Sequence, residues 1–224
     1  MPRVFAYIIR TVGARYRLNG SVPWVSHGKV FFGPCKKKMR PEVRPGDYIM
    51  GISGAGAGQP RRVLLWMHVF KTMTFGAAYE LGKTDIVFKS IRRGAIHVRP
   101  AKDVKFLPGV PESYEHIPNA GHAHDWASDL RGDRDVFLVG GKDSWIVEAE
   151  GPEVTQELVE LLKEGISWAG NATLKNPLTQ NAIGKHVLLT GGTAKKVISW
   201  VPRVRNPLQF SRRRTKCVRT CSCR

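Results

Sequence analysis

The hydrophobic and polar positions of this chain predict many short strands, most of which come before the helices. Short runs of apolar and β-branched residues are bounded by glycine, proline or charged residues, as expected for strands that pack on a core. The turn at Pro45-Gly46 introduces one of these strands, and residues 62–71 form the most apolar one. The predicted strands cover residues 4–9, 29–32, 47–52, 62–71, 86–88, 135–139 and 144–148.

Two neighbouring strands, at residues 47–52 and 62–71, are expected to pair antiparallel through a long connection. Glycine alternates with small or polar residues through most of residues 54–60, which predicts a mobile loop. The loop lacks the lysine and the hydroxyl residue of a phosphate-binding loop, and it leads into a strand rather than a helix. A nucleotide-phosphate cradle is therefore not expected there.

Helical periodicity is clearest after Pro152, where four apolar residues fall on one face before Gly165 ends the pattern. Residues 91–135 are mostly irregular. Further helical segments are predicted at residues 75–79, 125–130 and 180–189. Because most strands precede most helices, the order of elements predicts an α+β fold with a mainly antiparallel sheet and a few peripheral helices.

Composition agrees with one globular domain and a tail. The chain has 224 residues, of which 42% are apolar, and this excludes a disordered chain. The domain is assigned to residues 1–202. Residues 203–224 form a basic, cysteine-containing tail that is expected to be disordered because it has few bulky apolar residues.

The apolar segments are too short to cross a membrane. The longest, residues 63–70, contains His68 and is far below the roughly 20 residues that a membrane helix needs. The first strand is flanked by arginines and has no small-residue cleavage site, unlike a secretory signal. These patterns predict a cytoplasmic protein that does not enter the membrane.

Positive charge is concentrated at the two ends of the sequence. The net charge is +18; residues 1–60 hold ten bases against two acids, and residues 202–224 hold eight bases and no acid. A polyanion usually offsets such an excess, because phosphate contacts release bound counterions. We therefore expect a nucleic acid or nucleotide partner. An anionic lipid surface and a merely solvated basic surface are the alternatives.

Aromatic residues lie among the basic ones in the first third of the chain. Bases stack on such rings while lysine and arginine hold the sugar-phosphate backbone. Trp24 follows a proline in a polar loop, which favours it as a ring that faces a ligand, and Tyr48 lies on the predicted hairpin. Core packing is the expected role of Phe32, Trp66 and Phe70.

Two clusters of metal-ligating residue types are alternative candidates for a functional site. His122, His124 and Asp125 could place two imidazoles and a carboxylate around a metal that activates water. The glycine and proline around them favour an ordinary exposed loop instead. Three cysteines of the tail, at 217, 221 and 223, do not have the usual zinc-knuckle spacing and are expected to be oxidation-prone rather than metal-bound. No cofactor is assigned from the sequence.

A set of short motifs is spread over residues 3–190. They are Tyr7-Ile8-Ile9-Arg10, Cys35-Lys36, Pro45-Gly46-Asp47-Tyr48-Ile49-Met50-Gly51, Trp66-Met67-x-Val69, Phe75, Tyr79 and Asp133-Arg134-x-Val136-x-Leu138-Val139. In combination they resemble the second type of nucleotide-modification-associated domain. That family occurs in bacteria and phages and is linked, largely through gene neighbourhoods, to modification of nucleic-acid bases. The thiol loop departs from the family pattern, since a more cysteine-rich version is expected there.

A second likeness concerns shape alone. The Pro45-Gly46 turn, the two strands that follow and the glycine loop between them are similar to the central hairpin of PUA-like β-barrels, some of which read modified bases. This likeness implies a base that is flipped from its stack into a ring-lined cleft.

The resemblance implies a base-modification protein that acts on nucleic acid or a nucleotide, with possible partner modification enzymes. Motif membership makes Cys35 and Asp47 the candidate catalytic residues, and Trp24 or Tyr48 would stack on the base. A non-catalytic reader of modified nucleic acid and a metal-dependent hydrolase are the alternatives. The expected phosphate contacts are Arg10, Lys36, Lys37, Lys38, Arg40 and Arg44.

Overall fold

The predicted α+β class is confirmed by a computed structural model of the chain. Its described residues form a mainly antiparallel mixed sheet with four α-helices. The structure describes residues 1–9, 11–12, 17–18, 23–34, 36–54, 60–92, 94–118, 120, 125–147, 151–167 and 186–201.

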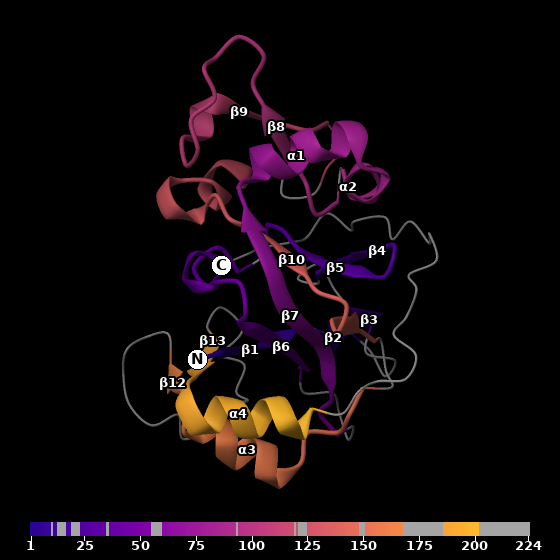
Figure 1. The fold of residues 1–224 in the computed structure, drawn as a ribbon, viewed down its shortest axis with the longest axis vertical. Helices are drawn as coiled ribbons and strands as arrows, with labels where there is room; N and C mark the ends of the chain where they lie inside the picture. The colour runs from indigo at the N-terminus through magenta and orange to yellow at the C-terminus, as the bar shows by residue number, and fades with distance from the viewer. Residues whose placement is uncertain are drawn as a thin grey trace.

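One nine-stranded sheet organises the described part of the chain (Figure 1). Its strands follow the order β12-β13-β1-β6-β7-β10-β5-β4, and β11 pairs beside β7. β1 and β6 are parallel, and the other pairs in the sheet are antiparallel. The bounds are β1 (Val4–Ile9), β4 (Trp24–Ser26), β5 (Lys29–Phe32), β6 (Tyr48–Ser53), β7 (Val63–Met73), β10 (Phe137–Gly140), β11 (Trp145–Ile146), β12 (Ile166–Ser167) and β13 (His186–Leu189).

The sheet is open rather than closed. Its strand path ends at β12 and at β4, so the described strands form no closed barrel and the PUA-like alternative is not confirmed. Two small two-stranded sheets are not hydrogen-bonded to it. One pairs β2 (Thr11–Val12) with β3 (Arg17–Leu18), and the other pairs β8 (Val98–Pro100) with β9 (Tyr114–His116), inside the segment that was expected to be mostly irregular.

The predicted hairpin is confirmed as the antiparallel pair β6 and β7. Tyr48 lies opposite His68 and Met50 lies opposite Trp66, so these four side chains share one face of the sheet. The register shifts after Gly51, next to the glycine loop. Most of that loop, residues 55–59, lies outside the described residues.

A β-bulge interrupts the pairing of β7 with β10. Gly140 lies opposite Val69, and Val139 lies opposite Lys71, so Phe70 has no residue opposite it on β10. The Phe70 side chain is 69% exposed. The prediction that Phe70 packs in the core is therefore wrong, because the extra residue of the bulge turns its ring toward solvent. Phe32 and Trp66 are buried as predicted.

Four helices cover the two ends of the molecule (Figure 1). They are α1 (Phe75–Thr84), α2 (Ile86–Ser90), α3 (Gln156–Lys163) and α4 (Gly191–Trp200). Thr74 and Thr155 cap α1 and α3, since each hydroxyl accepts a hydrogen bond from a first-turn N–H. Within the described residues, none of the helices has the length and apolar character needed to span a bilayer.

Two secondary-structure predictions need correction. The strand expected at residues 86–88 is α2, because the Asp85 carboxylate accepts the N–H of Val87 and caps a helix. The helix expected over residues 180–189 is wrong for its described part, where β13 pairs with β1. β13 is largely buried, and as a strand its backbone pairs with β1, which a helix could not do.

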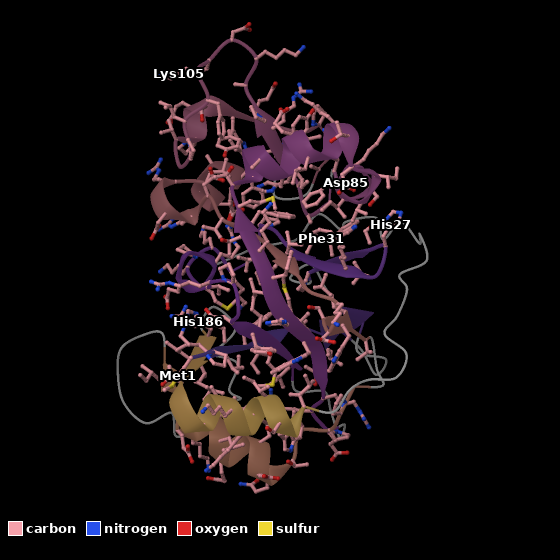
Figure 2. All side chains as sticks on the ribbon, in the orientation of Figure 1. Met1, His27, Phe31, Asp85, Lys105 and His186 are labelled. Atoms are coloured by element: carbon pink, nitrogen blue, oxygen red, sulfur yellow. The ribbon has the colours of Figure 1, made fainter. Side chains whose placement is uncertain are left out.

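Two hydrophobic clusters form the core. The larger lies between the sheet and the helices α3 and α4, and the smaller gathers around α1, α2, β8 and β9. Figure 2 shows Phe31 toward the end where α1 and α2 lie, and His186 on the side of Met1. Four short 3₁₀ turns link these parts: η1 (Arg40–Glu42), η2 (Pro111–Ser113), η3 (Trp126–Asp129) and η4 (Gly132–Arg134).

A close backbone approach at Gly151 gives a test of this packing. A Cβ there would lie 1.8 Å from the carbonyl oxygen of Val63, so Gly151→Ala must displace backbone and is expected to cost about 1–3 kcal/mol of unfolding free energy. Gly192, in the first turn of α4, has nothing within 4 Å of the same position. Gly192→Ala is expected to stabilise by about 0.5–1 kcal/mol. Urea unfolding of both variants checks the opposite signs, and equal effects would contradict the close approach.

Candidate functional site

Asp47 holds the turn that leads into β6. Its carboxylate accepts hydrogen bonds from the Arg3 N–H (3.1 Å), from Arg3 Nε (3.2 Å) and Nη2 (2.6 Å), and from the Arg44 N–H (2.9 Å). Asp47 is buried. Both oxygens are therefore engaged in fixing backbone, which is the role of a structural carboxylate. Its predicted part in chemistry stays a prediction.

The lysines of the basic loop, residues 36–44, divide between internal contacts and solvent. Lys36 Nζ lies 5.0 Å from the centre of the Tyr7 ring. The Lys36 backbone has a φ of 58°, a conformation that residues other than glycine rarely adopt. Lys37 Nζ donates to Ser128 Oγ at 2.7 Å and lies 3.8 Å from Asp125. Lys38 and Arg44 are exposed. These last two remain the most accessible of the predicted phosphate contacts in the described part of the loop.

Arg40 is buried, so its predicted contact with phosphate is wrong. None of its side chain is exposed. The guanidinium donates to the carbonyl oxygens of Asp129 (3.0 Å), Arg134 (2.9 Å) and Val136, and it lies over the Phe75 ring. A planar, five-donor group suits this work, since it satisfies several buried carbonyl oxygens at once. Arg40 thus joins the basic loop to residues 129–136.

A carboxylate and an imidazole accompany Arg40 in the interior; we call Arg40, His97 and Asp129 the buried cluster. Asp129 Oδ1 lies 3.8 Å from Arg40, and Asp129 Oδ2 lies 3.8 Å from His97 Nε2. Burial raises the pKa of the Asp129 carboxyl to about 7, although Arg40 and Lys37 act against this shift. A carboxyl with such a pKa can exchange a proton near neutrality, but its burial keeps it from direct contact with a large ligand.

His186 lies on β13, opposite Tyr7 of β1, in a second buried polar environment. Its ring is 5.5 Å from the Phe5 ring, and its Nε2 is 3.7 Å from Glu42 Oε2. Burial, with a smaller contribution from the charge of Lys36, lowers the pKa of His186 to about 4. The imidazole is therefore neutral at pH 7, and its approach to Glu42 is not an ion pair at that pH.

The structure separates the two rings that were predicted to stack on a base. Trp24 lies on β4, which ends the sheet, whereas Tyr48 lies on β6; β7, β10 and β5 lie between them. Trp24 is 45% exposed and rests against Gly94, where a Cβ would come within 2.8 Å of the ring. A single cleft lined by both rings is therefore not formed.

Tyr48 instead belongs to a ladder of rings on β6 and β7. The Tyr48 ring stacks on Trp66, with ring centres 5.0 Å apart, and on His68, with ring centres 4.6 Å apart. Phe70 continues the same row along β7 and is exposed by the bulge. We call Trp66, Tyr48, His68 and Phe70 the aromatic stripe. Because neighbouring rings already cover Tyr48, the accessible end of the stripe is at His68 and Phe70.

Two turns border this accessible end. The turn at residues 44–47 is fixed by reciprocal bonds, since Gly46 N–H donates to Val69 O and Val69 N–H donates to Asp47 O, each at 2.8 Å. On the other side Gly141 N–H donates to His68 O at 2.8 Å. The turns bring the exposed cations Arg44 and Lys142 to the region of the stripe, with one exposed acid, Asp143, beside Lys142.

His68 and Phe70 were not predicted as site residues from the sequence. One signal pointed to them: Trp66, His68 and Phe70 alternate along a strand, and alternation places side chains on one face. The bulge that exposes Phe70 depends on the pairing with β10, which comes from a distant segment. The sequence pattern alone therefore predicted that the Phe70 ring packs in the core.

Several predicted residues lie outside the described residues. These include Arg10, Cys35, His122 and His124. The remaining member of the metal alternative, Asp125, is near Lys37. Among the residues that the structure describes, no group of three or more histidine, cysteine, aspartate or glutamate side chains is arranged to hold a metal ion.

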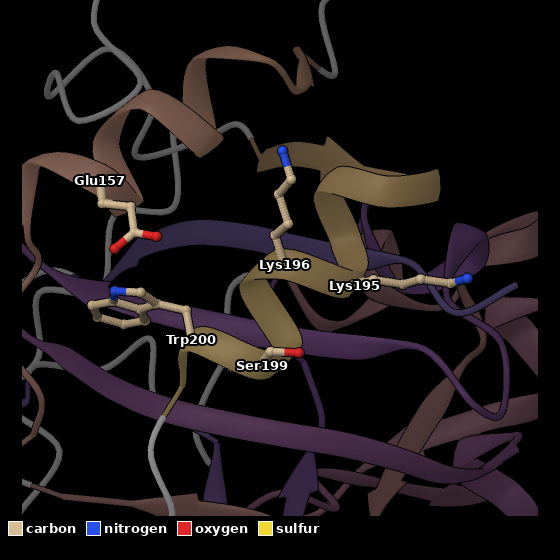
Figure 3. A pocket seen from close by; sticks show the side chains of 5 residues that line it. All are labelled: Glu157, Lys195, Lys196, Ser199 and Trp200. Carbon is tan, nitrogen blue, oxygen red and sulfur yellow. The ribbon is translucent and has the colours of Figure 1, made fainter.

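A shallow groove between α3 and α4 is a further hollow of the surface. It has a volume of about 440 Å³ and is lined by Glu157, Lys195, Lys196, Ser199 and Trp200. Figure 3 shows the Glu157 carboxylate beside the Trp200 indole and the two lysines pointing in different directions. The lysines are exposed and do not converge on one point, so the groove does not form a defined site.

Comparison with family models, with curated proteins and with solved structures gives no match for this chain. The functional assignment therefore depends on the residues of the aromatic stripe and on the charges around it.

Proposed function

We propose that this protein binds nucleic acid or a nucleotide through the aromatic stripe and takes part in modification of the bound base. The observation that carries the proposal is the exposed Phe70 ring, which stands at a β-bulge at the end of a stacked ladder of rings. A single exposed apolar residue is ordinary, but an exposed ring that adjoins other stacked rings forms a patch of the kind that marks an interaction site. Nucleic-acid bases stack on such rings with little dependence on sequence.

The charges around the stripe suit a polyanion. Arg44 and Lys142 are exposed on the turns whose backbone bonds to Val69 and His68, and Lys71 follows Phe70 along β7. The basic loop adds Lys38 at the surface. In this proposal the cations hold phosphates while Phe70 and His68 hold a base. The chemical step would then take place beside the stripe, near the turn that contains Asp47, and the reaction would belong to the cytoplasm.

The fold supports only a partial analogy with PUA-like barrels. The shared feature is the central hairpin of β6 and β7, in which the turn at residues 44–47 precedes the first strand. We propose that a base reaches this hairpin after leaving its stack, because a ring that projects from the sheet cannot contact the face of a base inside a duplex. Single-stranded nucleic acid and flipped-out bases are thus the favoured substrates over intact duplex.

Replacing Phe70 by alanine is expected to weaken binding of a single-stranded oligonucleotide strongly. Loss of one stacked base costs about 1–3 kcal/mol, which corresponds to roughly a 5- to 150-fold rise in Kd. Fluorescence anisotropy with a labelled oligonucleotide measures the change. Ile86→Ala is the matched control, because Ile86 is 62% exposed on α2, away from the stripe. Equal affinities of the Phe70 and Ile86 variants would exclude stacking on Phe70.

The phosphate contacts are tested in the same assay by varying salt. Arg44→Ala is expected to reduce the slope of log Kd against log salt by about 1, and Lys105→Ala, at the far end of the molecule, is expected to leave it unchanged. An affinity that does not depend on salt would contradict the proposal.

Modification itself is tested by mass spectrometry of nucleosides from cells that express the protein. A new or depleted base, absent with Phe70→Ala, supports a modification protein. Binding without any change in nucleosides favours the alternative, a reader of modified nucleic acid.

A further inference from the structure

The basic loop is fastened to the opposite segment, residues 125–136, by two side chains. Arg40 donates to carbonyl oxygens of that segment, and Lys37 bonds Ser128 and approaches Asp125. We call this set of contacts the clasp. The clasp fixes the same loop that presents Lys38 and Arg44, so it controls where those cations lie.

One ionisable carboxyl lies inside the clasp. Asp129 is buried with His97 on one side and Arg40 on the other, both at 3.8 Å. The other charged groups that act on it are Lys37 from the loop, Asp125 from the start of η3 and Arg134 from η4. The ring of His116, on β9, lies behind His97 with ring centres 6.2 Å apart.

We propose that the clasp is a pH-sensitive latch, closed while the Asp129 carboxyl keeps its proton and loosened when the proton leaves, so that the basic loop is released above neutral pH. Burying an ionised carboxylate costs free energy that its neighbours do not fully return. Opening the clasp gives the carboxylate access to water. The proton thus favours the closed form, and its loss favours the open form.

The direction and size of the effect follow from proton linkage. Burial raises the pKa of Asp129 to about 7 in the closed form, against 3.8 for a solvated carboxyl. Between these values the closed form binds more protons than the open form, so a rise in pH shifts the equilibrium toward opening. The opening constant is expected to rise about tenfold between pH 6 and pH 8 and then to level off.

Hydrogen exchange at single amides tests the latch in the full chain. The amides of Arg40 and Val43, bonded to Lys36 O and Arg40 O, report on the loop, and Leu130 N–H, bonded to Ala127 O, reports on the facing segment. After correction for the intrinsic pH dependence of exchange, protection of these amides is expected to fall about tenfold from pH 6 to pH 8. Amides of the β6–β7 ladder are expected to be more strongly protected at every pH, because they exchange only when the whole fold opens.

Two variants separate the latch from other causes. Asp129→Asn removes the ionisation and is expected to abolish the change in protection, whereas Asp103→Asn makes the same substitution at an exposed position outside the clasp and is expected to retain it. The wild-type measurement alone overturns the proposal if protection at Arg40, Val43 and Leu130 is constant from pH 6 to pH 8. Equal protection at the loop amides and at the β6–β7 amides also overturns it, because the loop would then open only together with the whole fold.

The regulatory meaning rests on the proposed function, but the latch does not. If no oligonucleotide binds at any pH, the proposed function fails while the exchange result still decides the latch. If binding occurs, its Kd is expected to depend on pH in the wild type and to lose part of that dependence in Asp129→Asn. Binding with identical pH profiles in the two proteins would overturn the regulatory role.

Discussion

Replacing Arg40 by methionine is expected to lower the free energy of unfolding by about 3–5 kcal/mol, because three buried carbonyl oxygens lose their charged donor. The substitution keeps most of the apolar stem but removes every donor. The carbonyl oxygens of Asp129, Arg134 and Val136 then lose the guanidinium, and so does the Asp129 carboxylate. A buried acceptor without a donor costs free energy that packing does not recover.

Urea unfolding at pH 7 measures this loss. Arg44→Met is the matched control, because Arg44 is exposed, and its effect is expected to stay within about 0.5 kcal/mol. Similar stabilities of the two variants would show that Arg40 is not held in the interior as described. Arg40 would then again be a candidate for contact with phosphate.

Acid is expected to destabilise the protein through His186, by up to about 3 kcal/mol. The pKa of the buried His186 is about 4, below the value of 6.5 for a solvated imidazole. Between these values the unfolded chain binds a proton that the folded protein excludes. Stability from the neutral ring is therefore fully present above pH 6.5 and is lost as the pH falls toward 4.

Because Asn removes only the His186 contribution, the difference in unfolding free energy between wild type and His186→Asn is expected to change by up to about 3 kcal/mol between pH 7 and pH 4. For His27→Asn, at an exposed hairpin position, the difference from wild type is expected to stay constant. Unfolding free energies from pH 4 to pH 7 give the comparison. The raised pKa of Asp129 acts in the opposite direction over much of this window, so the wild-type profile is flatter than either group would give alone. Parallel profiles of the His186 and His27 variants would show that His186 is not buried as a neutral ring.

Local pattern was sufficient for the central hairpin but not for elements whose partners are distant. β6 and β7 carry apolar runs, and the Pro45-Gly46 turn precedes β6, so the local pattern predicts a strand at both places. β13 becomes a strand because it meets β1, which lies far away in the sequence. The helix α2 had a usable signal, since Asp85 precedes an apolar segment and is a favourable N-cap.

The candidate site was only partly predictable for a related reason. Charge and residue type identified Arg44 and Lys38, which are exposed, but they equally identified Arg40, which is buried. Long charged side chains are almost never fully buried unless they are paired, so sequence alone favours exposure. Which arginine receives buried carbonyl partners depends on residues 129–136, and these reach Arg40 only in the folded chain.

The position of β1 in the sheet has a consequence for synthesis on the ribosome. β1 emerges before both of its partners, and one of its edges can pair with β6 early, while the other edge waits for β13, which is made much later. An unpaired strand edge invites association with other chains. Nascent molecules that stop before residue 186 should therefore be the species that chaperones bind most strongly.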